Sequence, residues 1–194
     1  LFRSALSVVL RETVRLNRVR WGIVYLQITR GVARRDHAFP PAGTRPSIVV
    51  TARNLDADAA ERAAADGVAV ITVPDNRWER VDIKSVSLLP NVLAKQSARE
   101  QGAREAWFVD QSGQITEGSS SNAWIVTRNG VLVTRHADSA ILKGITRTVV
   151  LKAISAQGLK LEERPFTLEE ARQAREAFIT AASQIVVPVV KIDG

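Results

Sequence analysis

The sequence contains neither cysteine nor methionine, and aromatic residues make up only 5% of its 194 positions. Without cysteine the chain can form no disulfide and no cysteine-based metal site, which fits a reducing compartment. No apolar run approaches the roughly 20 residues that a membrane-spanning helix requires. Charges interrupt the apolar residues of the first 18 positions, which is not the pattern of a signal peptide. We therefore expect a cytoplasmic protein with no membrane partner.

Acidic residues are also in short supply, because 20 of them face 27 basic residues and leave a formal net charge of +7. Of the basic residues, 21 are arginine and six are lysine. Such a balance can serve nucleic acid or an anionic ligand. The arginines are scattered and are not interleaved with aromatic residues, which argues against a nucleic-acid surface. We interpret them as charge spread over solvated faces and expect no nucleic-acid partner.

The remaining composition, 45% hydrophobic and 24% charged, is that of a globular protein. Apolar periodicity, turn residues and capping signals divide the chain into helices and strands. We expect helices at residues 1–20, 56–67, 90–101 and 144–157 and after residue 167, and strands at 22–29, 47–52, 68–73, 79–85, 105–109, 122–127, 130–134, 177–180 and 185–192. This mixture predicts an α/β or α+β architecture of the kind common in enzymes.

Two local signals are sharper than the rest. Asn129-Gly130 lies between two short apolar runs and predicts a tight hairpin. Thr167 and Glu170 have the spacing of a capping box and predict the start of a helix.

Lys84 is the first candidate for chemistry. Val81 and Ile83 alternate with Asp82 and Lys84, so in a strand the lysine would point away from the apolar face. A lysine amine in a ligand cavity can attack an aldehyde when burial or cationic neighbours hold it uncharged. The same pattern also fits a surface lysine on an edge strand.

Glu117 is the second candidate, because Gly118 and three serines follow it directly. This arrangement would place a carboxylate against a ligand, beside a loop of hydroxyl and backbone donors. A carboxylate next to a pyridine nitrogen keeps that nitrogen protonated and makes the ring an electron sink. A polar turn ahead of a hairpin would have the same sequence.

Three further segments are weaker signals. Gly144 precedes a helix whose first amides, at Ile145 and Thr146, could bind phosphate, although an ordinary helix start looks the same. Residues 180–183, TAAS, form a small hydroxyl-bearing loop between strands. Arg35 and His37 would share one face of an extended segment and could clamp a carboxylate, or could belong to a charged loop.

Together and in this order, these segments resemble the fold-type IV pyridoxal-phosphate (PLP) enzymes of the branched-chain/D-amino-acid aminotransferase class, and the D-amino-acid branch most closely. The matching stretches are VYLQITRGVARRDHAFP, DIKSVSLLPNVLAKQ, QITEGSSSNAW, ILKGITR and FITAAS with PVVKIDG, and they extend over residues 22–194. The resemblance implies a two-domain fold with the cofactor at the domain interface. Residues 1–56 would belong to the smaller N-terminal α/β domain, and residues 57–194 to the larger C-terminal domain that carries the PLP lysine.

The resemblance also implies a role for each matched residue. Lys84 would form a Schiff base with PLP and then move the substrate proton, and Glu117 would pair with the pyridine nitrogen. Further cofactor contacts would come from Ser121, Asn122, Leu142, Gly144, Ile145, Thr146, Ala182 and Ser183. Arg35 and His37 would hold the substrate α-carboxylate, in this branch typically from the partner subunit, which implies a homodimer. No metal is implied.

The sequence departs from the family pattern at its ends. The family normally begins with a further region that includes an arginine gripping the phosphate, and it continues beyond VKIDG. Part of the family's first connection is also missing after LFRSA, and no initiator methionine is present. We expect the sequence to lack an N-terminal part, an internal segment and a last helix.

Three readings of the function follow. The first is transamination of a D-amino acid such as D-alanine with a 2-oxo acid such as 2-oxoglutarate, which the pair Arg35 and His37 favours. The second is a branched-chain aminotransferase or an aminodeoxychorismate lyase of the same fold. The third, from another class, is a basic binding module without cofactor, which would be colourless and bind nucleic acid with a steep salt dependence.

Overall fold

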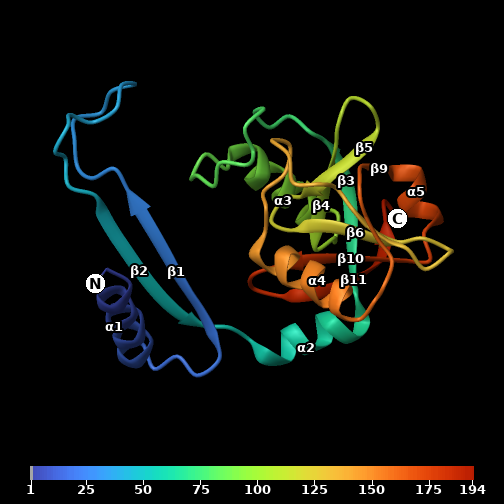
Figure 1. Cartoon of the computed structure of the whole chain (residues 1–194), viewed down its shortest axis with the longest axis horizontal. Coiled ribbons are helices and arrows are strands. Elements are labelled where there is room, and N and C mark those ends of the chain that lie inside the picture. The colour runs from blue at the N-terminus through green and yellow to red at the C-terminus, as the bar shows by residue number, and fades with distance from the viewer. Residues whose placement is uncertain (1) are drawn as a thin grey trace. The chain divides into compact units, whose positions relative to one another are not determined.

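The computed structural model describes residues 2–194, and this described chain divides into two compact units (Figure 1). Residues up to Ala59 form the first unit, and Ala60–Gly194 form the second. The division falls inside helix α2 (Ala57–Asp66), which Asp56 caps by accepting a hydrogen bond from the Ala59 amide at 3.0 Å. None of the described helices is both long enough and apolar enough to cross a membrane.

The first unit consists of helix α1 (Phe2–Leu16) and strands β1 (Gly22–Thr29) and β2 (Ser47–Asn54). The two strands pair antiparallel along their whole length, and α1 packs against β2. The structure confirms the strand predicted at residues 22–29 and extends the one predicted at 47–52 by two residues. The loop between the two strands, which contains Arg35 and His37, has no regular structure.

The second unit is built on a mixed sheet, which among the described residues has nine strands in the order β8-β7-β6-β10-β11-β3-β4-β5-β9. Its strands are β3 (Val68–Pro74), β4 (Glu105–Val109), β5 (Gln114–Gly118), β6 (Asn122–Val126), β7 (Leu132–Thr134), β8 (Leu161–Glu163), β9 (Phe166–Thr167), β10 (Glu176–Ala181) and β11 (Ile185–Ile192). Its helices after α2 are α3 (Leu89–Glu100), α4 (Ile145–Ala156) and α5 (Leu168–Gln173). The pairs β11–β3, β3–β4 and β7–β8 are parallel, and the other pairs are antiparallel.

Strand β4 lies in the middle of the core because both of its faces are buried. Trp107 is fully buried in the larger cluster, whereas its neighbours Ala106 and Phe108 point to the opposite face. On that second face, Ala94 and Ala98 of α3 pack against β4. Small side chains at positions i and i+4 allow the helix to approach the sheet closely. Apolar residues occupy four consecutive positions of β4, 106–109, as expected for a strand that is buried on both faces.

The sharper local signals are confirmed. Gly130 adopts a positive φ of 76° in the hairpin between β6 and β7, where the Gly130 amide donates to the Thr127 carbonyl at 2.9 Å. At the start of α5, the Thr167 hydroxyl accepts from the Glu170 amide at 3.0 Å, and the Glu170 carboxylate accepts from the Thr167 amide at 2.9 Å. Both halves of the predicted capping box are formed.

The strand predicted at residues 79–85 is wrong, because this segment consists of a turn at residues 81–82 with bends and irregular chain around it. The Ile83 amide donates to the Arg80 carbonyl at 3.1 Å, and the Arg80 side chain pairs with Asp82 at 2.9 Å. The alternation of apolar and polar residues at 81–84 is too short to favour a strand over these local bonds, since none of the described strands pairs with this segment. Strands β5, β8 and β9 were not predicted, and β8 and β9 have only three and two residues. So short a strand leaves no readable period.

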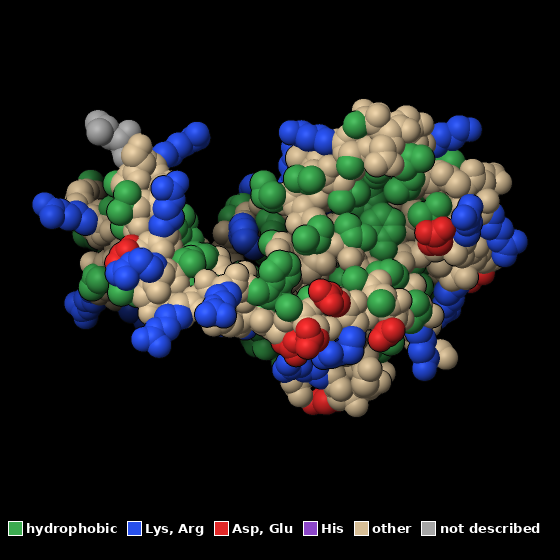
Figure 2. Space-filling model, turned by 90° about the horizontal axis from the view of Figure 1, so that it is seen from below, with side chains coloured by type: hydrophobic (Ala, Val, Ile, Leu, Met, Phe, Trp, Pro, Cys, Tyr) green, Lys and Arg blue, Asp and Glu red, His purple; other side chains and the backbone are tan. Residues whose placement is uncertain are grey.

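Figure 2 shows basic side chains on both units. Ten of the 21 arginines fall in residues 1–59, which contain only four acidic residues. On the face that Figure 2 shows, acidic side chains lie among the basic ones of the second unit.

Thr167→Ala should lower the free energy of unfolding by about 1 kcal/mol, because it removes the acceptor for the Glu170 amide at the start of α5. Urea denaturation would measure the change. Ser155→Ala, at an exposed position of α4, is the matched control and should have a smaller effect. Equal losses in the two variants would contradict a stabilising capping box.

Candidate functional site

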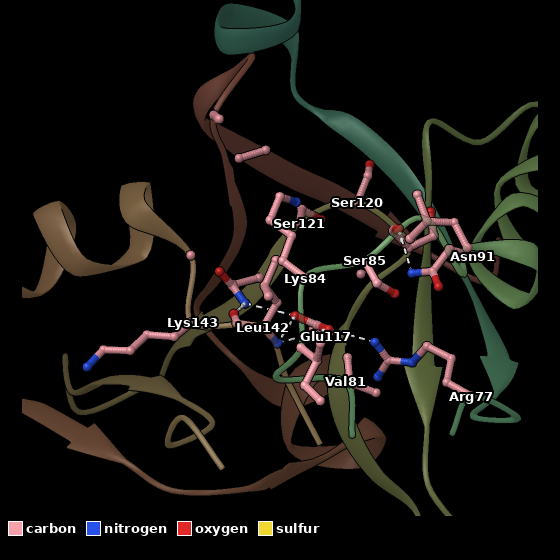
Figure 3. Close-up of a pocket in the computed structure, with 18 of the residues that line it drawn as sticks. Arg77, Val81, Lys84, Ser85, Asn91, Glu117, Ser120, Ser121, Leu142 and Lys143 are labelled. Atoms are coloured by element: carbon pink, nitrogen blue, oxygen red, sulfur yellow. Dashed lines mark hydrogen bonds and ion pairs between the residues drawn. The ribbon is translucent and has the colours of Figure 1, made fainter. Parts of the chain in front are cut away.

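A cavity of about 510 Å³ opens in the second unit (Figure 3). Its wall comes from the segment between β3 and α3, the end of β5, the start of β6, the approach to α4 and the end of β10. Nine residues singled out in the sequence line it: Lys84, Glu117, Ser121, Asn122, Leu142, Gly144, Ile145, Thr146 and Ala182. A cavity of this size is typical of a small-molecule or cofactor site.

Three predicted residues lie elsewhere. Ser183 is exposed in the turn between β10 and β11 and is not part of the cavity wall. Arg35 and His37 are exposed in the loop of the first unit. Their proposed contact with a substrate carboxylate stays a prediction.

Lys84 reaches the cavity from a turn and not from a strand. Val81 and Ile83 line the same cavity as Lys84, so the expected separation of the lysine from an apolar face is also wrong. The Val81 amide donates to the Ser139 carbonyl at 2.9 Å, which ties the turn to the loop ahead of α4. Among the described residues, the Lys84 amine has no hydrogen-bond or ion-pair partner.

Glu117 is the most perturbed acid in the cavity wall. It is 5% exposed and accepts hydrogen bonds from Arg77 Nη1 at 2.6 Å, Asn122 Nδ2 at 3.0 Å and the Leu142 amide at 3.1 Å. Burial nevertheless outweighs these bonds and raises the pKa of Glu117 to about 7. The hydrogen bonds and the charge of Arg77 therefore do not fully replace the solvation that the carboxylate loses on burial.

Arg77 is a functional residue that sequence reasoning missed. Its guanidinium donates to both oxygens of Asp75, at 2.9 and 2.8 Å, and to the Ala140 carbonyl at 3.1 Å. It also lies over the Phe108 ring, 4.3 Å from the centroid. Burial by itself would raise the pKa of Asp75, but the hydrogen bonds and charge of Arg77 lower it below its usual value. The available signal was an acid and an arginine two residues apart after a buried strand.

Asn122 and Gly144 fit together behind the opening of α4. Asn122 Nδ2 donates to the Leu142 carbonyl at 2.9 Å as well as to Glu117. A Cβ atom on Gly144 would lie 2.3 Å from Asn122 Oδ1, so only glycine allows this approach. Gly144 is also the N-cap of α4 and supplies no side-chain acceptor to the first turn. The first amides of this helix are therefore available to an anion.

The wall thus offers three kinds of group to one ligand. Lys84 supplies an amine, Glu117 supplies a buried carboxylate that is short of positive charge, and α4 supplies backbone donors. Lys143 lines the mouth, but Figure 3 shows its amine pointing away from the other side chains. The arrangement suits a ligand with an electrophilic carbon, a basic nitrogen and an anionic group.

Comparisons with known proteins agree on one family. The model of class IV amino-transferases matches residues 3–192. The D-alanine aminotransferase of Bacillus licheniformis is 43% identical over 185 residues, and that of Staphylococcus aureus strain MSSA476 is 41% identical over 187 residues. Each match covers 95% of this chain and 64% of the relative, so the chain spans 64% of the length of these curated relatives.

A solved structure supports the same grouping. The branched-chain amino acid aminotransferase of Escherichia coli has a TM-score of 0.82 with this chain at 25% identity. The match covers 98% of this chain and 64% of that structure.

Arg77→Met should destabilise the protein by about 3–5 kcal/mol, because it leaves the carboxylates of Glu117 and Asp75 buried without their shared cation. Urea denaturation at neutral pH would measure the loss. Arg80→Met removes an exposed ion pair with Asp82, which water and salt screen, and should cost far less. A loss from Arg77→Met no larger than that from Arg80→Met would show that the buried network contributes little.

The pKa of Glu117 predicts a specific pH dependence of stability. Its folded value of about 7 lies above the ordinary 4.5, so the folded protein holds a proton that the unfolded chain releases between these values. This contribution is complete below about pH 4.5 and is lost as the pH rises through about 7, and it is on the order of 3 kcal/mol. The difference in unfolding free energy between the wild type and Glu117→Gln should therefore fall across that interval. A difference that is constant or rises with pH would be the contrary result.

Proposed function

The chain belongs to the class IV aminotransferase family, and from this premise we propose that it takes part in PLP-dependent transamination with Lys84 as the residue that binds the cofactor. One observation carries the proposal: a single cavity brings together Lys84, Glu117 and the uncapped start of α4. These groups come from segments of the chain that are far apart in sequence.

The residues of the cavity fit PLP in three respects. Lys84 would hold the aldehyde carbon, because its amine has no competing partner among the described residues. Glu117 would face the pyridine nitrogen, whose proton supplies the positive charge that the raised pKa of this carboxyl shows to be lacking. The amides of Ile145 and Thr146 would hold the phosphate at the start of α4.

When bound, PLP supplies an aldehyde that takes up the substrate amino group and a ring that withdraws electrons from the substrate Cα. The chain's own residues then have distinct tasks. The Lys84 amine would act as a general base and acid, taking up the proton that the substrate Cα loses and giving it back later in the reaction. Glu117 would face the pyridine nitrogen and favour its protonated form, and Arg77 with Asn122 fixes the position of the Glu117 carboxylate.

The substrate that we favour is a D-amino acid such as D-alanine, with a 2-oxo acid such as 2-oxoglutarate as acceptor. Support comes from the two relatives of this name at 43% and 41% identity, and from Arg35 and His37, which could clamp an α-carboxylate. The alternative of a branched-chain substrate draws on the Escherichia coli structure. A coupled assay with a panel of D- and L-amino acids decides between them, and release of pyruvate from aminodeoxychorismate without an acceptor would instead identify a lyase.

We extend the proposal to a cytoplasmic homodimer in which the partner contributes the carboxylate clamp. The absence of cysteine and the exposed loop with Arg35 and His37 support it. Light scattering tests the oligomeric state, and a monomer with full activity would exclude a clamp from the partner.

Lys84→Ala should abolish transamination and the covalent attachment of PLP, because it removes the amine that would form the Schiff base, and the amine of Lys143 points away from the other lining side chains. After incubation with PLP and removal of the unbound cofactor, the purified wild type should still absorb visible light, and borohydride should fix the cofactor on Lys84. Lys152→Ala, at an exposed position of α4, is the matched control and should retain both properties.

Two results would count against the proposal. A wild-type protein that is colourless after unbound PLP has been removed, and that carries no cofactor after borohydride treatment, would favour a binding module without cofactor. Normal transamination by Lys84→Ala would leave the enzyme class standing and remove Lys84 from its role.

A further inference from the structure

A second buried carboxylate lies behind the serine loop, residues 119–121, which connects β5 to β6. Glu105, the first residue of β4, is only 1% exposed and pairs with Val70 of β3 in the middle of the sheet. The hydroxyls of all three serines donate to it: Ser119 to Oε1, Ser120 to Oε2 at 2.7 Å and Ser121 to Oε2 at 3.1 Å. Three consecutive hydroxyls thus converge on one carboxylate.

Backbone and cation contacts complete the surroundings of Glu105. The Ala106 amide donates to Oε1 at 3.0 Å, and Lys95 Nζ of α3 lies 3.3 Å from the same oxygen. Lys95 also donates to the Arg104 carbonyl at 2.6 Å, which fixes its amine beside the carboxylate. Removing water from a carboxylate is costly unless hydrogen bonds and charge replace the water, and these five donors do so.

The direction of the serine hydroxyls has a consequence for the cavity. Each hydroxyl has one proton to donate, and in the serine loop all three protons go to Glu105. The same serines line the cavity, where Figure 3 shows Ser120 and Ser121 among the lining side chains. Their oxygens therefore present lone pairs and not protons to a ligand, so the loop is suited to shaping the wall and poorly suited to holding an anion by its hydroxyls.

The serine loop lies in the sequence between Glu117 and Asn122, whose side chains contact each other. Glu117 lies just before Gly118 at the end of β5, Asn122 begins β6, and Asn122 Nδ2 donates to Glu117 at 3.0 Å. Gly118 has no room for a side chain, because a Cβ atom there would lie 2.2 Å from Ser121 Oγ and 3.2 Å from Glu105 Cγ. On the outer side, Asn91 of α3 donates to the Ser119 carbonyl at 2.9 Å.

We propose that Glu105 is a positioning residue for the cofactor site, which gathers the serine loop from behind and thereby sets Glu117 and Asn122 in the geometry that binds PLP. Glu105 does not line the cavity and acts only through the loop. The inference rests on the proposed function, since it concerns affinity for PLP. In this proposal the three serines hold the loop in place through their hydrogen bonds to Glu105, whether or not they also contact the ligand.

The primary test is Glu105→Gln, with PLP affinity measured by absorbance titration of the whole chain. A glutamine amide keeps the shape of the side chain but offers one acceptor oxygen in place of two, so some of the hydroxyls must turn away. We expect the dissociation constant for PLP to rise about tenfold or more, since charge-assisted hydrogen bonds that hold the loop are lost. Glu100→Gln, the same change at an exposed position of α3, should leave it unchanged.

A loss of stability alone must be separated from a loss of positioning. Val133→Ala opens a space in the core at a fully buried residue of β7 that does not line the cavity. It should lower the urea midpoint of the protein without cofactor but leave the dissociation constant for PLP as in the wild type. A rise for Val133→Ala as large as that for Glu105→Gln would overturn the positioning role.

Single serine variants keep the test open if Glu105→Gln fails to fold. Ser119→Ala and Ser121→Ala each remove one donor at a buried position and should weaken PLP binding, whereas Ser155→Ala on the surface of α4 should not. In the Glu105→Gln background, Ser121→Ala should add little, because the partner of the hydroxyl is already lost. Equal effects of Ser121→Ala in both backgrounds would overturn the inference.

The two proposals fail in different ways. A wild-type protein that binds no PLP overturns the proposed function and this inference with it. A wild-type protein that binds PLP no more tightly than Glu105→Gln overturns this inference alone.

Discussion

The carboxylate of Glu117 is held where water cannot solvate it, and much of the cavity is arranged around that constraint. Arg77, Asn122 and the Leu142 amide replace the lost water with hydrogen bonds from three separate segments. Arg77 also pairs with Asp75, so the charge of Glu117 belongs to a network of three charged side chains. Even so, the pKa of Glu117 stays near 7, which means that the site has capacity for one more positive group. In the proposed function, a protonated pyridine nitrogen would be that group.

The same physics operates twice around one loop. Glu105 and Glu117 are both buried, and each accepts hydrogen bonds from a different set of donors. Because buried charges are expensive without partners, both carboxylates fix the segments that supply the donors. Hydrogen bonds and ion pairs to these carboxylates therefore fix the wall of the cavity, while the apolar clusters around Trp107 and Phe108 stabilise the sheet. A site that binds a charged cofactor gains from a wall whose polar groups are fixed before binding.

Sequence patterns predicted most of the second unit because its elements obey local rules. The hairpin at Asn129-Gly130 and the capping box at Thr167 depend on neighbouring residues alone, and both are formed. The strand at residues 79–85 failed for the opposite reason: its alternation is real, but a strand also needs a partner, and local turns formed instead. The resemblance in the motifs around Lys84, Glu117 and Gly144 nevertheless identified residues that share one cavity.

The sequence by itself determined the family, most of the helices and strands of the second unit and the candidates Lys84, Glu117 and Gly144, because these depend on short motifs and on periodicity. Only the tertiary structure revealed Arg77 as the partner of Glu117 and Glu105 as the partner of the serines. Arg77 is 40 residues from Glu117 in the chain, and Glu105 is separated by 14 to 16 residues from the three hydroxyls. Such contacts leave no local period or turn signal, since they arise only when the folded sheet removes water from a carboxylate and the nearest donors must replace it.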